Sequence, residues 1–138
     1  MNKIYMIGDS TMQYNNIFSY PQTGWGQVLH LFAKNNWLIE DYAKNGRSTK
    51  SFIDEGRFDV VLNRLQKGDY VICQFGHNDE KENDPSRYTT KDGSYLDNLE
   101  YFHQEVTKKG AHIVYATSIS RRKFQDGKCI DTHKGYPQ

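Results

Sequence analysis

Four apolar runs of strand length alternate along the chain with segments whose apolar residues recur at helical spacing. The runs, rich in β-branched and aromatic residues, cover 3–7, 37–43, 69–75 and 111–119. The segments with helical spacing lie between them, at 25–33, 58–65 and 95–106. Strands that alternate with helices predict one α/β domain over residues 1–138, with a parallel sheet and right-handed crossovers.

Three of the four predicted strands end in clusters of small and polar residues. The clusters are Gly8-Asp9-Ser10, Asn45-Gly46-Arg47-Ser48 and Gly76-His77-Asn78-Asp79. The carboxyl ends of parallel strands share one edge of a sheet, and ligands bind along that edge. We therefore expect the three clusters to meet in one site.

The residue types in these clusters suit acyl transfer. A serine at a strand end can be a nucleophile if a base accepts its proton. The anion that then forms on the attacked carbonyl needs donors already directed at it. The backbone N–H groups of Ser10 and Gly46 and the carboxamide of Asn78 are three such donors. Each cluster alone is also typical of an ordinary turn or helix cap, so the prediction depends on their joint occurrence.

A phosphate site is the rival interpretation of the first cluster. A polar turn between a first strand and a first helix can bind a phosphate, as flavodoxin-like folds do for a nucleotide cofactor. Here the turn carries the negative Asp9 and lacks both further glycines and a following lysine. The sequence therefore favours acyl transfer.

Composition narrows the class of partner. The formal net charge of +1 gives no indication of nucleic acid or a membrane surface. No apolar stretch approaches membrane-spanning length and no signal peptide is recognisable, so we expect a cytoplasmic protein. Cys73 lies in an apolar run and Cys129 in a polar segment, which predicts neither a disulfide framework nor a metal site. Ten tyrosines among 14% aromatic residues favour a wet, aromatic groove suited to sugars.

The clusters resemble the motifs of the SGNH, or GDSL, hydrolases, a superfamily named for a serine, a glycine, an asparagine and a histidine in four separate blocks. The matching segments are "GDST" at 8–11, "NGRSTKSF" at 45–52 and "GHND" at 76–79. Other segments are similar to the rhamnogalacturonan acetylesterase group of that superfamily. They are "GWGQVL" at 24–29, "EGR" at 55–57, "RRKF" at 121–124 and "DTHKGYP" at 131–137.

This resemblance implies a three-layer α/β/α sandwich with the sheet order 2-1-3-4-5. It implies a serine esterase that removes acetyl groups from plant cell-wall polysaccharide or oligosaccharide, of the rhamnogalacturonan, pectin or xylan type. Ser10 would be the nucleophile, and Ser10, Gly46 and Asn78 would form the oxyanion hole, with no metal or organic cofactor. The candidate substrate-binding residues beside them are Asp9, Arg47 and His77.

The fourth block of the superfamily, an Asp-x-x-His that supplies the base, has no match. Asp131 and His133 are only two positions apart, in a segment that resembles an upstream loop, so His133 is not assigned as the base. By this comparison we expect the fifth strand and the last helices to be absent and the chain alone to be nearly inactive. We also expect the bare edge of the fourth strand to pair with a second copy or a partner chain.

Two alternatives to an esterase remain open. One is a carbohydrate-binding pseudoenzyme that uses the aromatic groove without turnover. The other is a lipase or thioesterase relative, although polar and aromatic loop residues favour a sugar over an acyl chain.

Overall fold

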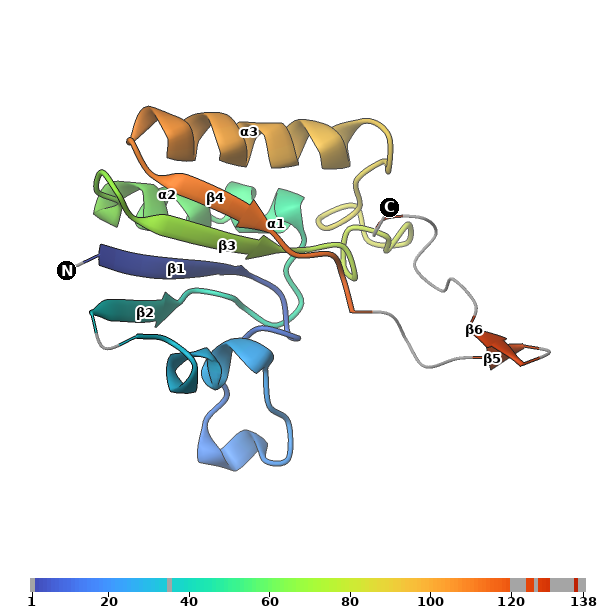
Figure 1. Cartoon of the computed structure of the whole chain (residues 1–138). Helices are drawn as coiled ribbons and strands as arrows, with labels where there is room; N and C mark the ends of the chain where they lie inside the picture. Colours follow the sequence, from blue (N-terminus) through green and yellow to red (C-terminus); the bar gives the residue numbers. More distant parts are fainter. Residues whose placement is uncertain (1, 35, 120–123, 126, 130–135, 137–138) are drawn as a thin grey trace.

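The main sheet of the computed structural model has four parallel strands in the order β2-β1-β3-β4 (Figure 1). The structure describes residues 2–34, 36–119, 124–125, 127–129 and 136. The four strands are β1 (Asn2–Gly8), β2 (Trp37–Asp41), β3 (Tyr70–Gln74) and β4 (His112–Tyr115). The predicted parallel sheet and the first four positions of the predicted order are confirmed.

A small hairpin lies apart from the main sheet in Figure 1. It consists of two antiparallel strands, β5 (Phe124–Gln125) and β6 (Lys128–Cys129). The sequence did not predict it, because strands of two residues are too short to show a periodic pattern.

Three helices cover one face of the main sheet (Figure 1). They are α1 (Thr49–Asp54), α2 (Arg57–Arg64) and α3 (Ser94–Lys108), and the last two confirm the helices predicted at 58–65 and 95–106. The core beneath them is aromatic. Phe102 is fully buried and its ring centroid lies 4.6 Å from that of Phe58 and 5.8 Å from that of Phe75.

The helix predicted at 25–33 is wrong. This segment forms two short 3₁₀ turns, η2 (Trp25–Gln27) and η3 (Leu29–Leu31), after a third, η1 (Ile17–Ser19). Gly26 lies so close to another loop that a Cβ there would be 2.5 Å from the Met12 carbonyl oxygen. The Trp25 indole donates to Gln74 of β3 at 2.6 Å. These tertiary contacts override the helical periodicity of the sequence.

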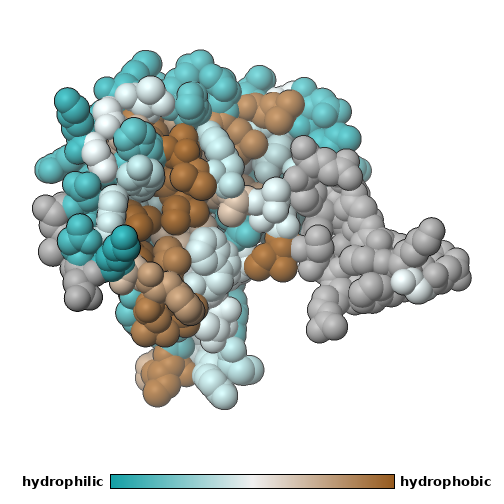
Figure 2. Space-filling model, viewed as in Figure 1, coloured by the Kyte–Doolittle hydropathy of each residue, from teal (hydrophilic) through white to brown (hydrophobic). Residues whose placement is uncertain are grey.

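The other face of the sheet is covered only in part. Met6, Met12 and Ala43 form a small second core that packs against Trp25 and Leu29. Beyond it, strand side chains line an apolar groove of about 230 Å³, and Figure 2 shows apolar side chains gathered on this surface. The groove residues are Ile4, Trp37, Tyr70, Ile72 and Val114. Among the described residues the expected third layer is therefore partial, and pairing of the β4 edge with another chain stays a prediction.

Candidate active site

The three polar clusters follow neighbouring strands at one edge of the sheet, where β1, β2 and β3 end (Figure 1). Gly8, the last residue of β1, is the register partner of Gln74 in β3. The Gly8 carbonyl accepts a hydrogen bond of 3.0 Å from the N–H of Lys44, which follows β2. The sequence predicted this convergence from the topology of parallel sheets.

The first cluster is a tight turn built around Asp9. The Asp9 carbonyl accepts from the N–H groups of Met12 and Gln13, both at 3.1 Å. Its carboxylate accepts from the N–H of Thr11 at 3.1 Å and from the Thr11 hydroxyl at 2.9 Å. The turn leaves Ser10 partly exposed at the end of β1.

The Asp9 side chain stabilises this turn from inside the protein, with only 1% of the residue's surface exposed. Burial raises the pKa of the Asp9 carboxyl, while hydrogen bonds from Thr11 and the charge of the nearby His77 oppose that rise. The carboxylate is thus enclosed by the turn and stabilises the backbone around Ser10, and substrate binding by Asp9 stays a prediction.

A buried polar network supports the turn from β3. The Gln74 side-chain oxygen accepts from the Trp25 indole and lies 3.1 Å from the Thr11 hydroxyl oxygen, and the Gln74 amide donates to the Thr117 carbonyl at 2.8 Å. Sequence reasoning treated Gln74 as part of an apolar strand. The available signal was the amide itself, because a polar group inside a buried strand requires hydrogen-bond partners.

The second cluster places Gly46 at the tip of its turn, with φ at +78°, where a glycine is unstrained. The N–H of Asn45 donates to the Gln13 side chain, which joins this turn to the Ser10 turn. The Arg47 guanidinium folds back onto the Asn45 carbonyl at 2.8 Å and pairs with Glu55 at 3.0 Å. Arg47 thus stabilises the Gly46 turn, and its expected contact with substrate stays a prediction.

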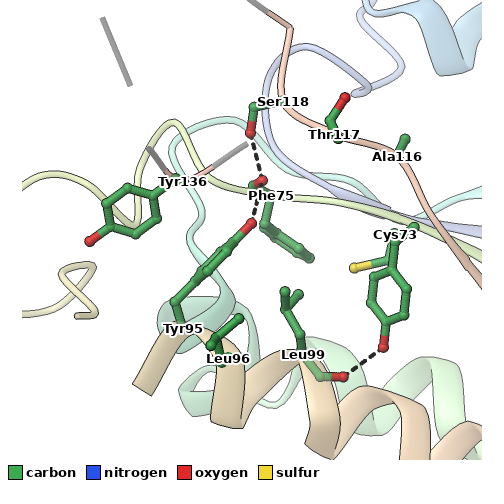
Figure 3. A pocket seen from close by; sticks show the side chains of 10 residues that line it. Cys73, Phe75, Tyr95, Leu96, Leu99, Ala116, Thr117, Ser118 and Tyr136 are labelled. Carbon is green, nitrogen blue, oxygen red and sulfur yellow. Dashed lines mark hydrogen bonds between the residues drawn. The ribbon is translucent and has the colours of Figure 1, made fainter. Parts of the chain in front are cut away.

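The third cluster begins where two side chains converge on the end of β3. The hydroxyls of Ser118 and Tyr95 both donate to the Phe75 carbonyl, at 2.7 and 3.0 Å, beside a cavity of about 170 Å³ (Figure 3). Gly76 has φ at +143°, which L side chains rarely adopt, and a Cβ there would lie 2.2 Å from the Ser118 hydroxyl oxygen, so glycine suits this position. The chain then turns sharply toward Asn78.

Asn78 connects the third cluster to the second. Its carboxamide nitrogen donates to the Arg47 carbonyl at 3.0 Å, and its carboxamide oxygen accepts from Arg87 at 3.0 Å. Only 8% of its surface is exposed. Sequence reasoning missed Arg87, although the segment Asp84-Pro85-Ser86 before it is typical of an Asx turn that would hold a following side chain in place.

His77, the third candidate substrate-binding residue, is half-buried, and its Nε2 lies 2.8 Å from the Ile119 carbonyl oxygen. A carbonyl only accepts hydrogen bonds, so this nitrogen carries a proton in the structure. In this arrangement Nε2 cannot accept the Ser10 proton. Asp131 and His133 lie outside the described residues.

Asp79 ties the end of β3 to the start of α1. Its fully buried carboxylate accepts from the N–H and the hydroxyl of Thr49 and, at 2.9 Å, from the hydroxyl of Thr89. Burial raises the pKa of Asp79 to about 6 against these hydrogen bonds. Asp79 is thus a structural anchor of the third cluster.

Asp41, a partly buried carboxyl, lies at the end of β2. One of its oxygens accepts from the N–H of Ala43 at 2.9 Å, and the other is buried with no hydrogen-bond partner among the residues that the structure describes. Burial raises the pKa of Asp41 to about 6. The folded chain therefore binds this proton more tightly than the unfolded chain does, and its share of stability is lost as pH rises from about 4 through 6.

We expect Asp41→Asn to reduce the loss of stability between pH 4.5 and pH 7.5. The asparagine amide stays neutral at both pH values. At pH 7.5 the variant's free energy of unfolding should therefore exceed that of the unmodified chain by about 1 kcal/mol, after allowance for partial exposure. Urea denaturation at both pH values measures it. Asp54→Asn, at an exposed position on α1, is the matched control. If the free energy of unfolding depends equally on pH in Asp41→Asn and Asp54→Asn, the loss of stability does not come from Asp41.

No family model matches the chain. Over 136 residues it is 36% identical to the rhamnogalacturonan acetylesterase RhgT of Bacillus subtilis (strain 168), and 35% identical to the probable rhamnogalacturonan acetylesterase YesY of the same organism. The matches cover 98% of this chain, but 57% and 62% of those proteins. The chain thus spans about six tenths of the length of these relatives.

Solved structures show the same fold. Protein YXIM of Bacillus subtilis superposes with a TM-score of 0.74 at 27% identity, over 88% of this chain and 33% of that one. The esterase EstA of Pseudoalteromonas sp. and a lipase/acylhydrolase of Enterococcus faecalis give TM-scores of 0.64 and 0.60, over 62% and 60% of their chains and 86% and 89% of this one. At 16% and 18% identity, these two matches show the fold alone.

The parallel sheet and these matches define the fold class: the chain has the α/β fold of SGNH hydrolases. Within that class it is a homologue of rhamnogalacturonan acetylesterases, which confirms the resemblance found in the sequence. Its relatives are carboxylic ester hydrolases by name.

Two negative findings apply to the described part of the chain. None of its helices is long and apolar enough to cross a membrane. Nor does that part contain three or more histidine, cysteine, aspartate or glutamate side chains grouped so that they could hold a metal ion. The cytoplasmic location stays a prediction.

Proposed function

We propose that this chain carries the nucleophile and oxyanion donors of a serine esterase that removes acetyl groups from a plant cell-wall polysaccharide or oligosaccharide. The observation that carries the proposal is the linkage of three turns at one sheet edge. Asn45 bonds to Gln13 of the Ser10 turn, and Asn78 bonds to the carbonyl of Arg47. The names of the relatives support rhamnogalacturonan as the polymer, with pectin and xylan esters as related candidates.

In the proposed reaction the Ser10 hydroxyl oxygen attacks the acetyl carbonyl carbon. The carbonyl oxygen becomes an oxyanion, which accepts from the N–H groups of Ser10 and Gly46 and from the carboxamide of Asn78. The bond between the acetyl carbonyl carbon and the sugar oxygen then breaks, and that oxygen takes up a proton and leaves as the sugar hydroxyl. Water attacks the acetyl-serine in the second step and releases acetate.

A base must accept the proton that leaves the Ser10 hydroxyl. Without such a base, the chain alone forms the acetyl-serine slowly. His77 directs its Nε2 at the Ile119 carbonyl, so this nitrogen does not serve as that base in this arrangement. Oxyanion donors without a functioning triad leave a rate of roughly 10³- to 10⁴-fold over water in serine hydrolases. We therefore propose that the 138-residue chain by itself hydrolyses esters slowly.

The loop after the Ser10 turn supports a sugar substrate. Tyr14, Phe18 and Tyr20 are 64%, 94% and 83% exposed, and aromatic faces of this kind suit the apolar faces of sugar rings. The loop is held in place because Asn15 exchanges two backbone hydrogen bonds with the Gln27 side chain, at 3.0 and 3.1 Å.

Acetate release tests the proposal directly. We expect release from acetylated rhamnogalacturonan to exceed release from acetylated xylan and from p-nitrophenyl butyrate at equal ester concentration, and to be absent in Ser10→Ala. A preference for the butyryl ester would instead support a lipase or thioesterase relative.

A second candidate function, carbohydrate binding without turnover, is favoured by the engaged Nε2 of His77. Affinity electrophoresis of the Ser10→Ala chain in gels containing the acetylated polymer separates the two functions. Retardation without acetate release by the unmodified chain would establish the binding function, and release would exclude it.

A further inference from the structure

The carboxamide of Asn78 is held at both ends by groups that cannot exchange roles. The Arg87 guanidinium donates from Nη1 to the carboxamide oxygen at 3.0 Å, and the Arg47 carbonyl accepts from the carboxamide nitrogen at 3.0 Å. A guanidinium only donates and a carbonyl only accepts. The two contacts together therefore permit one orientation of the amide and exclude its flipped form.

Within the described part of the chain, this orientation leaves one hydrogen of the carboxamide nitrogen for a ligand. The nitrogen has two hydrogens, and one of them is donated to Arg47. In the flipped form the oxygen would take the place of the nitrogen, and an oxygen would repel an oxyanion instead of stabilising it. The direction of the amide thus decides whether Asn78 can serve as an oxyanion donor.

Arg87 is itself fixed in place. Its Nε donates to Asp84 at 2.8 Å, and its backbone N–H donates to the Asp84 carbonyl at 3.0 Å. Asp84 in turn accepts from the N–H of Ser86 at 3.1 Å and from its hydroxyl at 2.6 Å. These hydrogen bonds from Ser86 and Arg87 lower the pKa of the Asp84 carboxyl. The guanidinium also lies beside the second cluster, 4.0 Å from the place of a Cβ on Gly46.

We propose that Arg87 is a positioning residue for ester hydrolysis: it fixes the carboxamide of Asn78 in the orientation that presents an N–H to the oxyanion. The inference rests on the function proposed above and adds a residue that the three motifs do not contain. Arg87 acts through Asn78, so its effect depends on the presence of that amide.

Kinetics of Arg87→Met provide the first test. We expect kcat for ester hydrolysis to fall roughly 10-fold to 100-fold with KM unchanged, since a misdirected donor affects the transition state alone. Arg87→Lys, which keeps a charged donor, should recover part of this loss. Arg64→Met is the matched control, because Arg64 pairs with Glu40 away from the three clusters.

A double-mutant cycle distinguishes positioning from a direct effect of the Arg87 charge. In an Asn78→Ala background, Arg87→Met should have almost no further effect, because the amide it orients is gone. If the two losses instead multiply, Arg87 acts independently of Asn78 and the inference is overturned. Unchanged kcat in Arg87→Met would overturn it as well.

A side-chain ¹⁵N–¹H spectrum tests the inference even if the chain shows no turnover. Asn78→Ala identifies the two carboxamide signals of Asn78. In Arg87→Met we expect these signals to move toward those of a free amide and to exchange faster with water. The carboxamide signals of Asn15, which is held at both ends by Gln13, should not change. Unaltered Asn78 signals would refute the role of Arg87, whereas absent ester hydrolysis with altered signals would refute only the proposed function.

Discussion

Ser10→Ala is expected to lower kcat/KM for acetyl ester hydrolysis to background, a loss of at most about 10³-fold to 10⁴-fold at the slow rate proposed for the chain alone. The reason is chemical: without the hydroxyl oxygen no acetyl-serine forms, and oxyanion donors alone cannot replace the covalent step. The fold should be unaffected, because Ser10 is partly exposed and the Asp9 carboxylate and Thr11 maintain the turn.

Two measurements check this expectation. Acetate release gives the rate, and mass spectrometry after treatment with a fluorophosphonate shows whether Ser10 forms an adduct. Ser19→Ala, at an exposed serine of the same loop region, is the control and should retain both activity and labelling. Full activity in Ser10→Ala would place the nucleophile elsewhere and remove the basis of the esterase proposal.

Phe102→Ala is expected to cost about 3–5 kcal/mol of unfolding free energy, a large share of the stability of a domain this size. The Phe102 side chain is fully buried between α3 and the sheet, in contact with the rings of Phe58 and Phe75. Its removal leaves a cavity between these rings that the aromatic core cannot close without moving α3 toward β3.

Urea denaturation monitored by circular dichroism measures the loss. Phe18→Ala is the matched control: the same atoms are deleted from a side chain that is 94% exposed. That variant should remain within about 0.5 kcal/mol of the unmodified chain. A similar loss in both variants would mean that the aromatic cluster under α3 is not the main core.

The sequence was sufficient for the features that depend on general rules of parallel sheets. Apolar runs gave the strands, the spacing of Phe58 to Leu65 and of Tyr95 to Val106 gave two helices, and the topology brought Ser10 and Asn78 to one edge. These predictions succeeded because burial on both faces and helical periodicity leave a direct trace in residue order.

Features that depend on contacts between distant side chains could not be predicted in this way. Trp25 has the spacing of a helix, but its indole bond to Gln74, 49 residues away, accompanies a 3₁₀ turn. The hydrogen bonds of Asp9 to Thr11 and of Arg47 to Glu55 are seen only in the structure, because no spacing rule in the sequence pairs these side chains. Arg87 lies nine residues from Asn78 with no motif to associate them.

The hydrogen bonds between the turns couple ligand binding at this sheet edge to folding of the domain. The links from Gln13 to Asn45 and from Arg47 to Asn78 span 32 and 31 residues. Local structure alone cannot form them, so the reactive edge exists only after β1, β2 and β3 have associated. A molecule that occupies this edge therefore binds the native state almost exclusively, and a saturating amount should raise the melting temperature of the whole domain by mass action.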